Sequence, residues 1–188
     1  MGVVEALTGI ASSFGFSASA GLNAYLTFLI VALAARFTSL IHLNAPYDAL
    51  TSGWIIGLLL ILTLVEGLVD KIPAVDTAND LVQSFVRPVA GAILFAASSN
   101  VIADLHPVLA LACGLLISGV VHSAKAAARP AITAMTAGVG NPIVSTLEDI
   151  VAAITTLLSL LVPVLALILI AVGAGLFWRV VHPSRTEA

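Results

Sequence analysis

Long apolar stretches follow one another along the chain, with little polar sequence between them. A helix that crosses a membrane needs about 20 apolar residues, so these stretches are candidate spans, although several are short. Lipid offers no hydrogen-bond partners to the backbone, and the runs lack the alternation of barrel strands. The pattern predicts an all-α, polytopic helical membrane protein, with residues 1–188 forming a single integral membrane domain. The candidate spans are residues 22–35, 54–69, 88–103, 108–121 and 150–177.

Three segments depart from this simple pattern. In GIASSFGFSASAG (residues 9–21), glycine and serine recur so densely that we expect a broken or re-entrant helix. The last stretch is long and contains Pro163, which predicts a tilted or kinked span. FTSLIHLNAPYDALTSG (residues 37–53) is rich in turn-forming residues and is expected to be an extramembrane loop.

Composition supports the membrane prediction and removes other classes of protein. The chain is 60% hydrophobic and 9% charged, with a mean hydropathy of +1.15, far from the composition of a soluble domain. The net charge is −3 and no basic tract is present, which excludes nucleic acid as a partner. The single cysteine, Cys113, excludes a disulfide framework. The expected partner is the lipid bilayer, and the GxxxG spacing of Gly53 and Gly57 indicates close helix packing or a homo-oligomer.

The positions of lysine and arginine bear on the orientation of the chain. If residues 126–140 cross the bilayer, even as a half-helix, every lysine and arginine from Lys71 onward can face the cytoplasm. If this segment does not cross, the charge bias nearly vanishes. We favour the crossing, which predicts a cytoplasmic C-terminus.

Two segments in opposite halves of the chain share a sequence pattern. PAVDTANDLV (residues 73–82) aligns with PIVSTLEDIV (residues 142–151). We therefore expect an internal duplication, with halves at residues 1–104 and 105–188, which is the usual plan of secondary transporters. The identical pairs are Pro73 and Pro142, Val75 and Val144, Thr77 and Thr146, Asp80 and Asp149, and Val82 and Val151.

Charged residues are scarce, yet the segment VEGLVDKIPAVDTANDLV holds several acids. Glu66 and Asp70 are spaced i,i+4 on one helix face, and Lys71 follows them. A carboxylate within a span usually pairs, lines a cavity or relays protons, and is therefore a functional hypothesis. Asp80 and Asp149 hold equivalent positions in the duplication, either as acids of a first helical turn or as a symmetric carboxylate pair. The candidate metal ligands are Glu66, Asp70 and Asp80.

Helix capping is the structural alternative for two other acids. Asp76 precedes Asn79 by three residues, and Ser145 precedes Glu148 by three, which is the spacing of a capping box. We interpret Asp76 and Glu148 first as caps and keep both among the binding candidates.

Polar residues elsewhere could complete a binding site. Lys125 and Arg129 repeat the i,i+4 spacing with positive charge, and His122 precedes them. They could pair with the acids or hold a phosphate or carboxylate, or they could simply face the cytoplasm. Asn23 follows the glycine- and serine-rich segment, where a broken helix would place a polar group at membrane depth, or it could be a packing hydrogen bond.

The segments GLNAYLTFLIVALAARF, VEGLVDKIPAVDTANDLV and RPVAGAILFA together resemble a family of small bacterial membrane proteins, the domain of unknown function 4126. The resemblance implies a compact multi-pass protein of the bacterial cytoplasmic membrane, but it supplies no activity. It also implies that the characteristic motif contains Glu66, Asp70, Lys71, Pro73, Asp76 and Asp80.

These features favour a small secondary transporter or channel-like carrier, coupled to protons or to a metal cation. Its substrate would be an ion, a small organic anion or a lipid phosphate. One alternative is a metal-dependent membrane enzyme acting on lipid, because clustered acids could hold Mg²⁺ against a phosphate. The chain lacks the D-G-x-x-A-R pattern of CDP-alcohol transferases, which makes an enzyme the less favoured class. The other alternative is a structural or assembly subunit.

Overall fold

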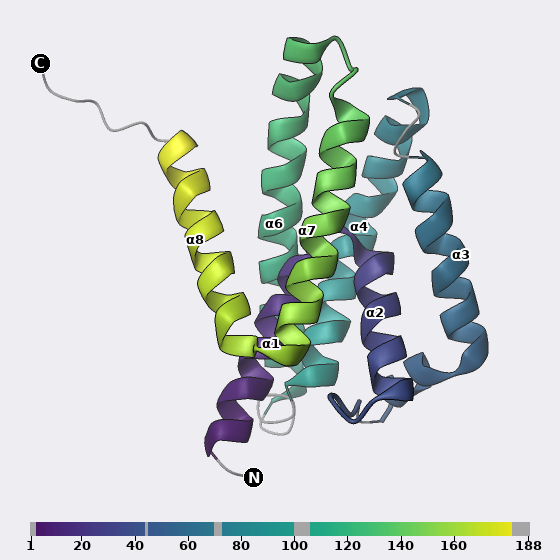
Figure 1. Ribbon diagram of the computed structural model, residues 1–188, viewed down its shortest axis with the longest axis vertical. Coiled ribbons are helices and arrows are strands. Elements are labelled where there is room, and N and C mark those ends of the chain that lie inside the picture. The colour runs from purple at the N-terminus through teal and green to yellow at the C-terminus, as the bar shows by residue number, and fades with distance from the viewer. Residues whose placement is uncertain (1–2, 44, 70–72, 100–105, 182–188) are drawn as a thin grey trace, which may run out of the picture.

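The computed structural model describes residues 3–43, 45–69, 73–99 and 106–181, and these residues form seven α-helices and one short 3-10 helix (Figure 1). The all-α prediction is confirmed. The side chains of residues 3–5, 73–78 and 80, and of several residues in the last helix, lie outside this description. The helices are α1 (Val3–Leu22), α2 (Ala24–Phe37), η1 (Tyr47–Thr51), α3 (Gly53–Val69), α4 (Pro73–Ser98), α6 (Pro107–Thr136), α7 (Asn141–Leu161) and α8 (Pro163–Val181).

The lengths of the helices and the placement of apolar and polar side chains are those of a protein surrounded by lipid. By length and composition, three segments of the described chain could cross a membrane, namely Leu81–Ser98 of α4, all of α6 and all of α7. Large apolar side chains point outward, and Leu60 and Leu64 of α3 expose 49% and 60% of their surface. Serine, glutamine and arginine side chains are buried instead. This inverted pattern is typical of a helical membrane protein.

The first two helices form a hairpin inside the bundle. α1 packs against α4, α6, α7 and α8, and the chain then turns at Asn23 into α2, which runs back toward the end from which α1 rises (Figure 1). Residues that follow α2, Leu40 and Ile41, line the same cavity as Thr8 and Ser12 of α1. The tip of the hairpin therefore lies within the bundle, between the two ends of α6.

Close approach of helix backbones holds α4, α6 and α1 together. Gly91 of α4 and Gly114 of α6 face each other so closely that a Cβ on Gly114 would overlap the Gly91 carbonyl oxygen. A Cβ on Gly21 of α1 would lie 2.6 Å from the carbonyl oxygen of Ser118. Small residues permit this packing, as they do between membrane helices in general.

The glycine- and serine-rich segment is a continuous helix, which corrects the prediction of a break within it. Residues 9–21 all lie in α1, and the break falls just beyond them, at Asn23. Three of its four serine hydroxyls find acceptors without interrupting the helix: Ser12 donates to the Ser159 carbonyl, Ser13 to the Gly9 carbonyl and Ser17 to the Gly91 carbonyl. Small side chains here serve close packing.

The last predicted span is also corrected. It consists of α7 and α8, separated at Val162, so Pro163 ends one helix and begins another. Val162 has φ −142° and ψ 72°, which lies outside the α region that a following proline disfavours. In Figure 1, α8 turns back and leans away from the bundle.

Two further boundaries differ from the predictions. The predicted span at 88–103 begins much earlier, because α4 starts at Pro73 and passes through Pro88. The predicted span at 108–121 continues through Pro130 to Thr136, so most of residues 126–140 extend α6. Neither proline stops its helix, since tertiary packing compensates for one missing backbone hydrogen bond.

A pair of glycine substitutions on α6 tests the close packing. We expect Gly114→Ala to lower the free energy of unfolding by about 1–3 kcal/mol, because the added methyl group overlaps α4. Gly119→Ala is the matched control, since no atom lies within 4 Å of its Cβ position. Thermal unfolding of the detergent-purified proteins measures both. Equal stability of the two variants would contradict the packing described here.

Candidate functional site

The interior of the bundle contains a group of charged and polar side chains from several helices and from the break between α1 and α2. We call this group the charged cluster. Each member is held by at least one other, or by the backbone where α1 ends and α2 begins. Its described members are Asn23, Glu66, Arg87, His122, Lys125, Arg129, Glu148 and Asp149.

One part of the charged cluster is an ion pair without contact to solvent. Arg87 Nη2 of α4 lies 3.0 Å from Glu66 Oε1 of α3, and the two side chains are 0% and 1% exposed. Arg87 Nη1 lies 3.3 Å from His122 Nδ1, and His122 Nε2 lies 3.0 Å from the Ser84 hydroxyl. The Arg87 carbonyl accepts a hydrogen bond from Ser118 at 2.6 Å. Removing either charge would leave the other buried and uncompensated.

A second part of the charged cluster joins α6 to α7. Glu148 Oε2 lies 2.8 Å from Lys125 Nζ and 3.3 Å from Arg129 Nη2. The three side chains are 3%, 10% and 15% exposed for Lys125, Arg129 and Glu148 respectively. Exposure thus rises toward the turn that joins α6 and α7. One carboxylate therefore holds two cations in a partly open position.

The sequence of α6 explains why these cations face inward. Its buried residues recur every three or four positions, so they form one stripe along the helix. The side chains at the beginning of this stripe are small, where α6 packs against α4. Those in its second half are ionisable. In chain order it contains Ala110, Gly114, Ser118, His122, Lys125 and Arg129.

The break between α1 and α2 contacts this second part. The Asn23 side chain accepts a hydrogen bond from the Leu26 N–H as the N-cap of α2, and its amide donates to Asp149 Oδ1 at 2.8 Å. Lys125 Nζ also donates to the Leu22 carbonyl at 3.2 Å, where α1 ends. A cation at a helix C-terminus and a capping side chain at an N-terminus satisfy the groups that a broken helix exposes.

The two parts are electrostatically connected and balanced. Lys125 interacts with the charge of Arg87 as well as with Glu148 and Arg129. Among the described members of the charged cluster, with a neutral histidine, the positive charges of Arg87, Lys125 and Arg129 equal the negative charges of Glu66, Glu148 and Asp149. Any ion that enters this region alone would upset that balance in a medium that screens charge poorly.

The structure brings together seven residues that the sequence singled out. Asp70 and Lys71 lie outside the described residues. Asp76 and Asp80 lie in the first turns of α4, but their side chains are outside the description, so their roles stay predictions. The seven that meet are Asn23, Glu66, His122, Lys125, Arg129, Glu148 and Asp149.

Two partners were missed at the sequence level. The sequence predicted for Arg87 only a position facing the cytoplasm, and nothing in the sequence pointed to Ser84. A signal existed, because Gln83 and Arg87 have the same i,i+4 spacing as Lys125 and Arg129. Both are almost fully buried on α4.

The capping interpretations are wrong, because both helices begin earlier than expected. α4 starts at Pro73, so Asp76 lies inside its first turn, and α7 starts at Asn141 after the N-cap Gly140. Ser145 is therefore an interior residue of α7, 3% exposed. Glu148 binds Lys125 and Arg129 as described above.

The metal hypothesis receives no support from the part of the chain that is described. No group of three or more His, Cys, Asp or Glu side chains there could hold a metal ion. Glu66 faces a guanidinium, so a metal ion at Glu66 would have to compete with Arg87. The hypothesis for Asp70 and Asp80 stays a prediction.

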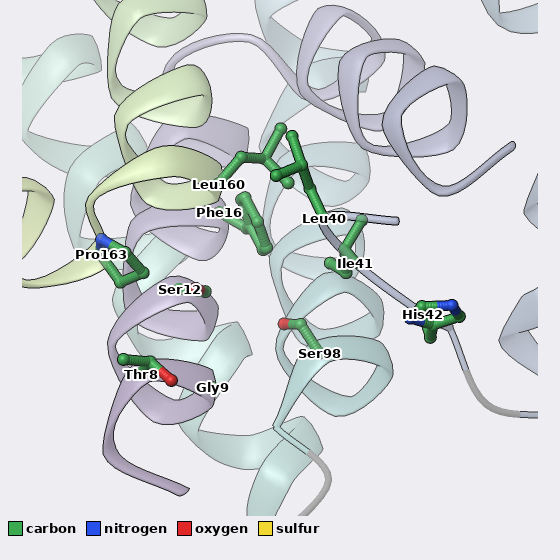
Figure 2. A pocket seen from close by; sticks show the side chains of 10 residues that line it. All are labelled: Thr8, Gly9, Ser12, Phe16, Leu40, Ile41, His42, Ser98, Leu160 and Pro163. Carbon is green, nitrogen blue, oxygen red and sulfur yellow. The ribbon is translucent and has the colours of Figure 1, made fainter. Parts of the chain in front are cut away.

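A separate cavity of about 350 Å³ lies at the end of the bundle where α1 begins (Figure 2). Ser12 and Phe16 of α1 line it, together with Ser98 at the end of α4 and Leu160 at the end of α7. In Figure 2 the loop after α2 passes beside it, with His42 farthest out. The cavity therefore lies at the opposite end from the turn between α6 and α7.

A double-mutant cycle tests the buried ion pair. We expect Glu66→Gln or Arg87→Gln to lower the free energy of unfolding by about 3–5 kcal/mol, because each leaves an unpaired buried charge. The double variant should lose clearly less than the sum of the two single losses. The exposed Asp48, changed to Asn, is the control and should have little effect. Additive losses in thermal unfolding would mean that the pair is not coupled.

Comparison with known proteins identifies the family of the chain. A sequence model of one family, described as Domain of unknown function (DUF4126), matches residues 10–182. No curated protein and no solved structure matches the chain. The matched residues run from within α1 to the end of α8 and include every described member of the charged cluster. The chain therefore belongs to the DUF4126 family.

Proposed function

We propose that the protein is a small secondary transporter or channel-like carrier, whose substrate site is the charged cluster beside the break at Asn23. The observation that carries the proposal is the position of this break. A helix that ends inside the bundle and faces buried charges is the arrangement from which transporters build their substrate sites. We further propose that α1 and α2 act as a re-entrant hairpin. Ionisable residues inside membrane proteins usually mark such pathways.

The charge balance of the cluster favours a particular substrate and coupling ion. Glu148 contacts both Lys125 and Arg129 through its carboxylate. If Glu148 takes up a proton, its attraction for both cations falls, and one small anion can take its place. The described charges then stay balanced if the anion is singly charged, as one protonation state of phosphate or of a dicarboxylate is, whereas an anion that enters alone leaves an uncompensated negative charge. The arrangement thus supports proton-coupled binding of a phosphate or carboxylate.

The two alternatives have less support. A metal-dependent enzyme acting on lipid would rely on acids such as Asp70, Asp76 and Asp80, whose side chains lie outside the described structure. A structural subunit would not require a charged cluster next to a helix break. The homo-oligomer, the internal duplication, the cytoplasmic C-terminus and the bacterial cytoplasmic membrane stay predictions.

Proton-coupled anion uptake can be tested in liposomes. The purified protein is reconstituted into liposomes that contain the pH-sensitive dye pyranine, and inorganic phosphate, glycerol 3-phosphate or succinate is added outside. We expect at least one of these anions to acidify the lumen. Glu148→Gln should lower that rate at least tenfold, because the variant cannot take up the proton.

The control variant is Asp48→Asn, which removes an exposed acid in η1 and should retain the wild-type rate. Thermal unfolding of Glu148→Gln checks that the variant is folded. The proposal fails if none of the three anions acidifies the lumen, or if folded Glu148→Gln is as active as the wild type.

A further inference from the structure

One face of α1 is in contact with α7 over a long distance. Ser12, Phe16, Ser19 and Asn23 are spaced by four, three and four residues, which places them on the same side of the helix. At one end Ser12 donates to the Ser159 carbonyl at 2.8 Å. At the other end Asn23 donates to Asp149 at 2.8 Å. The two helices are therefore antiparallel, and Ser19 faces the part of α7 between these contacts.

The side chains on the facing surface of α7 are mostly polar and mostly small. Asp149, Ala152, Thr156 and Ser159 are spaced by three, four and three residues, and the last three are fully buried. The hydroxyls of Thr156 and Ser159 donate to carbonyls of their own helix, at Ala152 and Thr155. Each hydroxyl oxygen can still accept a hydrogen bond. We call this contact region the α1–α7 seam; its polar residues are Ser12, Ser19, Asn23, Asp149, Thr156 and Ser159, and the buried Phe16 and Ala152 lie among them.

Ser19 is the residue of the seam that protein atoms do not satisfy. It is 1% exposed, and within the described residues its hydroxyl has no hydrogen-bond partner. An unsatisfied buried hydroxyl costs about 1–3 kcal/mol, which a water molecule can offset. The other serines of α1 differ, because Ser13 and Ser17 bond across to Ser98 and Gly91 of α4.

The seam joins the two polar regions of the molecule. Ser12 and Phe16 line the cavity at the end of the bundle, and Figure 2 shows them beside Leu160 of α7. The opposite end of the seam is the Asn23–Asp149 contact of the charged cluster. The seam offers only a few hydroxyls, whereas a dehydrated metal cation needs about six oxygen ligands. Its chemistry therefore suits water.

We propose that the α1–α7 seam holds a chain of water molecules that carries protons between the cavity and Asp149. Each water or hydroxyl accepts one proton and passes one on, so the chain is unchanged after each transfer. The proton reaches the Asp149 carboxylate and passes from there, within the charged cluster, to Glu148, the acid that the proposed function protonates, so that Asp149 returns to its carboxylate form. This inference rests on the proposed function for its purpose, since it supplies the route of the coupling proton.

Cysteine labelling tests whether water reaches the seam. The native thiol is first removed by Cys113→Ser, which leaves the full chain without cysteine. Ser19→Cys is then compared with Ser17→Cys, which is equally buried but faces α4. In lipid nanodiscs, 2-aminoethyl methanethiosulfonate is added and the modified fraction is followed by intact mass. The cysteine thiolate attacks the sulfenyl sulfur of the reagent, forms a mixed disulfide and releases methanesulfinate, and the thiolate forms only where water can solvate it.

We expect Ser19→Cys to react at least tenfold faster than Ser17→Cys. Equal rates would overturn the proposal. Thr156→Cys probes the opposite wall against the same control, and it decides the question if Ser19→Cys does not fold. Labelling needs no transported substrate, so a reactive Ser19→Cys together with absent anion uptake would contradict the proposed function and not the water-filled seam.

Discussion

Pairing of buried charges is the constraint on which the rest of this structure depends. A charge inside a bundle surrounded by lipid is poorly hydrated, so each one requires an opposite charge or a hydrogen-bond partner in direct contact. Glu66 and Arg87 meet this requirement between α3 and α4, and Glu148 meets it for two cations of α6. The ion pairs therefore help to fix which helices are neighbours and the register in which they pack along their axes.

Close backbone packing makes the pairing possible. Gly91 and Gly114 bring α4 and α6 together, and Gly21 brings α1 against α6. Without side chains at these positions, the inward stripe of α6 can place Lys125 next to the end of α1. Small residues on one half of a helix thus position charged residues on the other half.

The break at Asn23 is stable for the same reason. A helix end inside lipid would expose N–H and C=O groups at a cost of several kcal/mol each. Asn23 satisfies the Leu26 N–H and Lys125 satisfies the Leu22 carbonyl, while the bond from Asn23 to Asp149 holds the capping side chain in place. The charged cluster and the helix break therefore stabilise each other through polar contacts.

The sequence by itself determined the class of the protein and most members of the cluster. Apolar runs predict membrane helices because lipid forces backbone hydrogen bonds to form within each segment, and rare polar residues in such runs stand out. The resemblance to the family also followed from the sequence and was confirmed. Asn23, Glu66, His122, Lys125, Arg129, Glu148 and Asp149 were all identifiable in this way.

Only the tertiary structure decided which of these residues meet and where the helices end. Glycine, serine and proline weaken an isolated helix, yet α1 is continuous through its serines and α6 continues through Pro130, because neighbouring helices satisfy and pack the backbone. The partner of Glu66 is likewise a long-range property, since its choice of Arg87 depends on how α3 and α4 pack. Local sequence determines which segments favour a helix and which face of each helix is polar. Contacts between distant segments determine where each helix ends and which buried side chains pair.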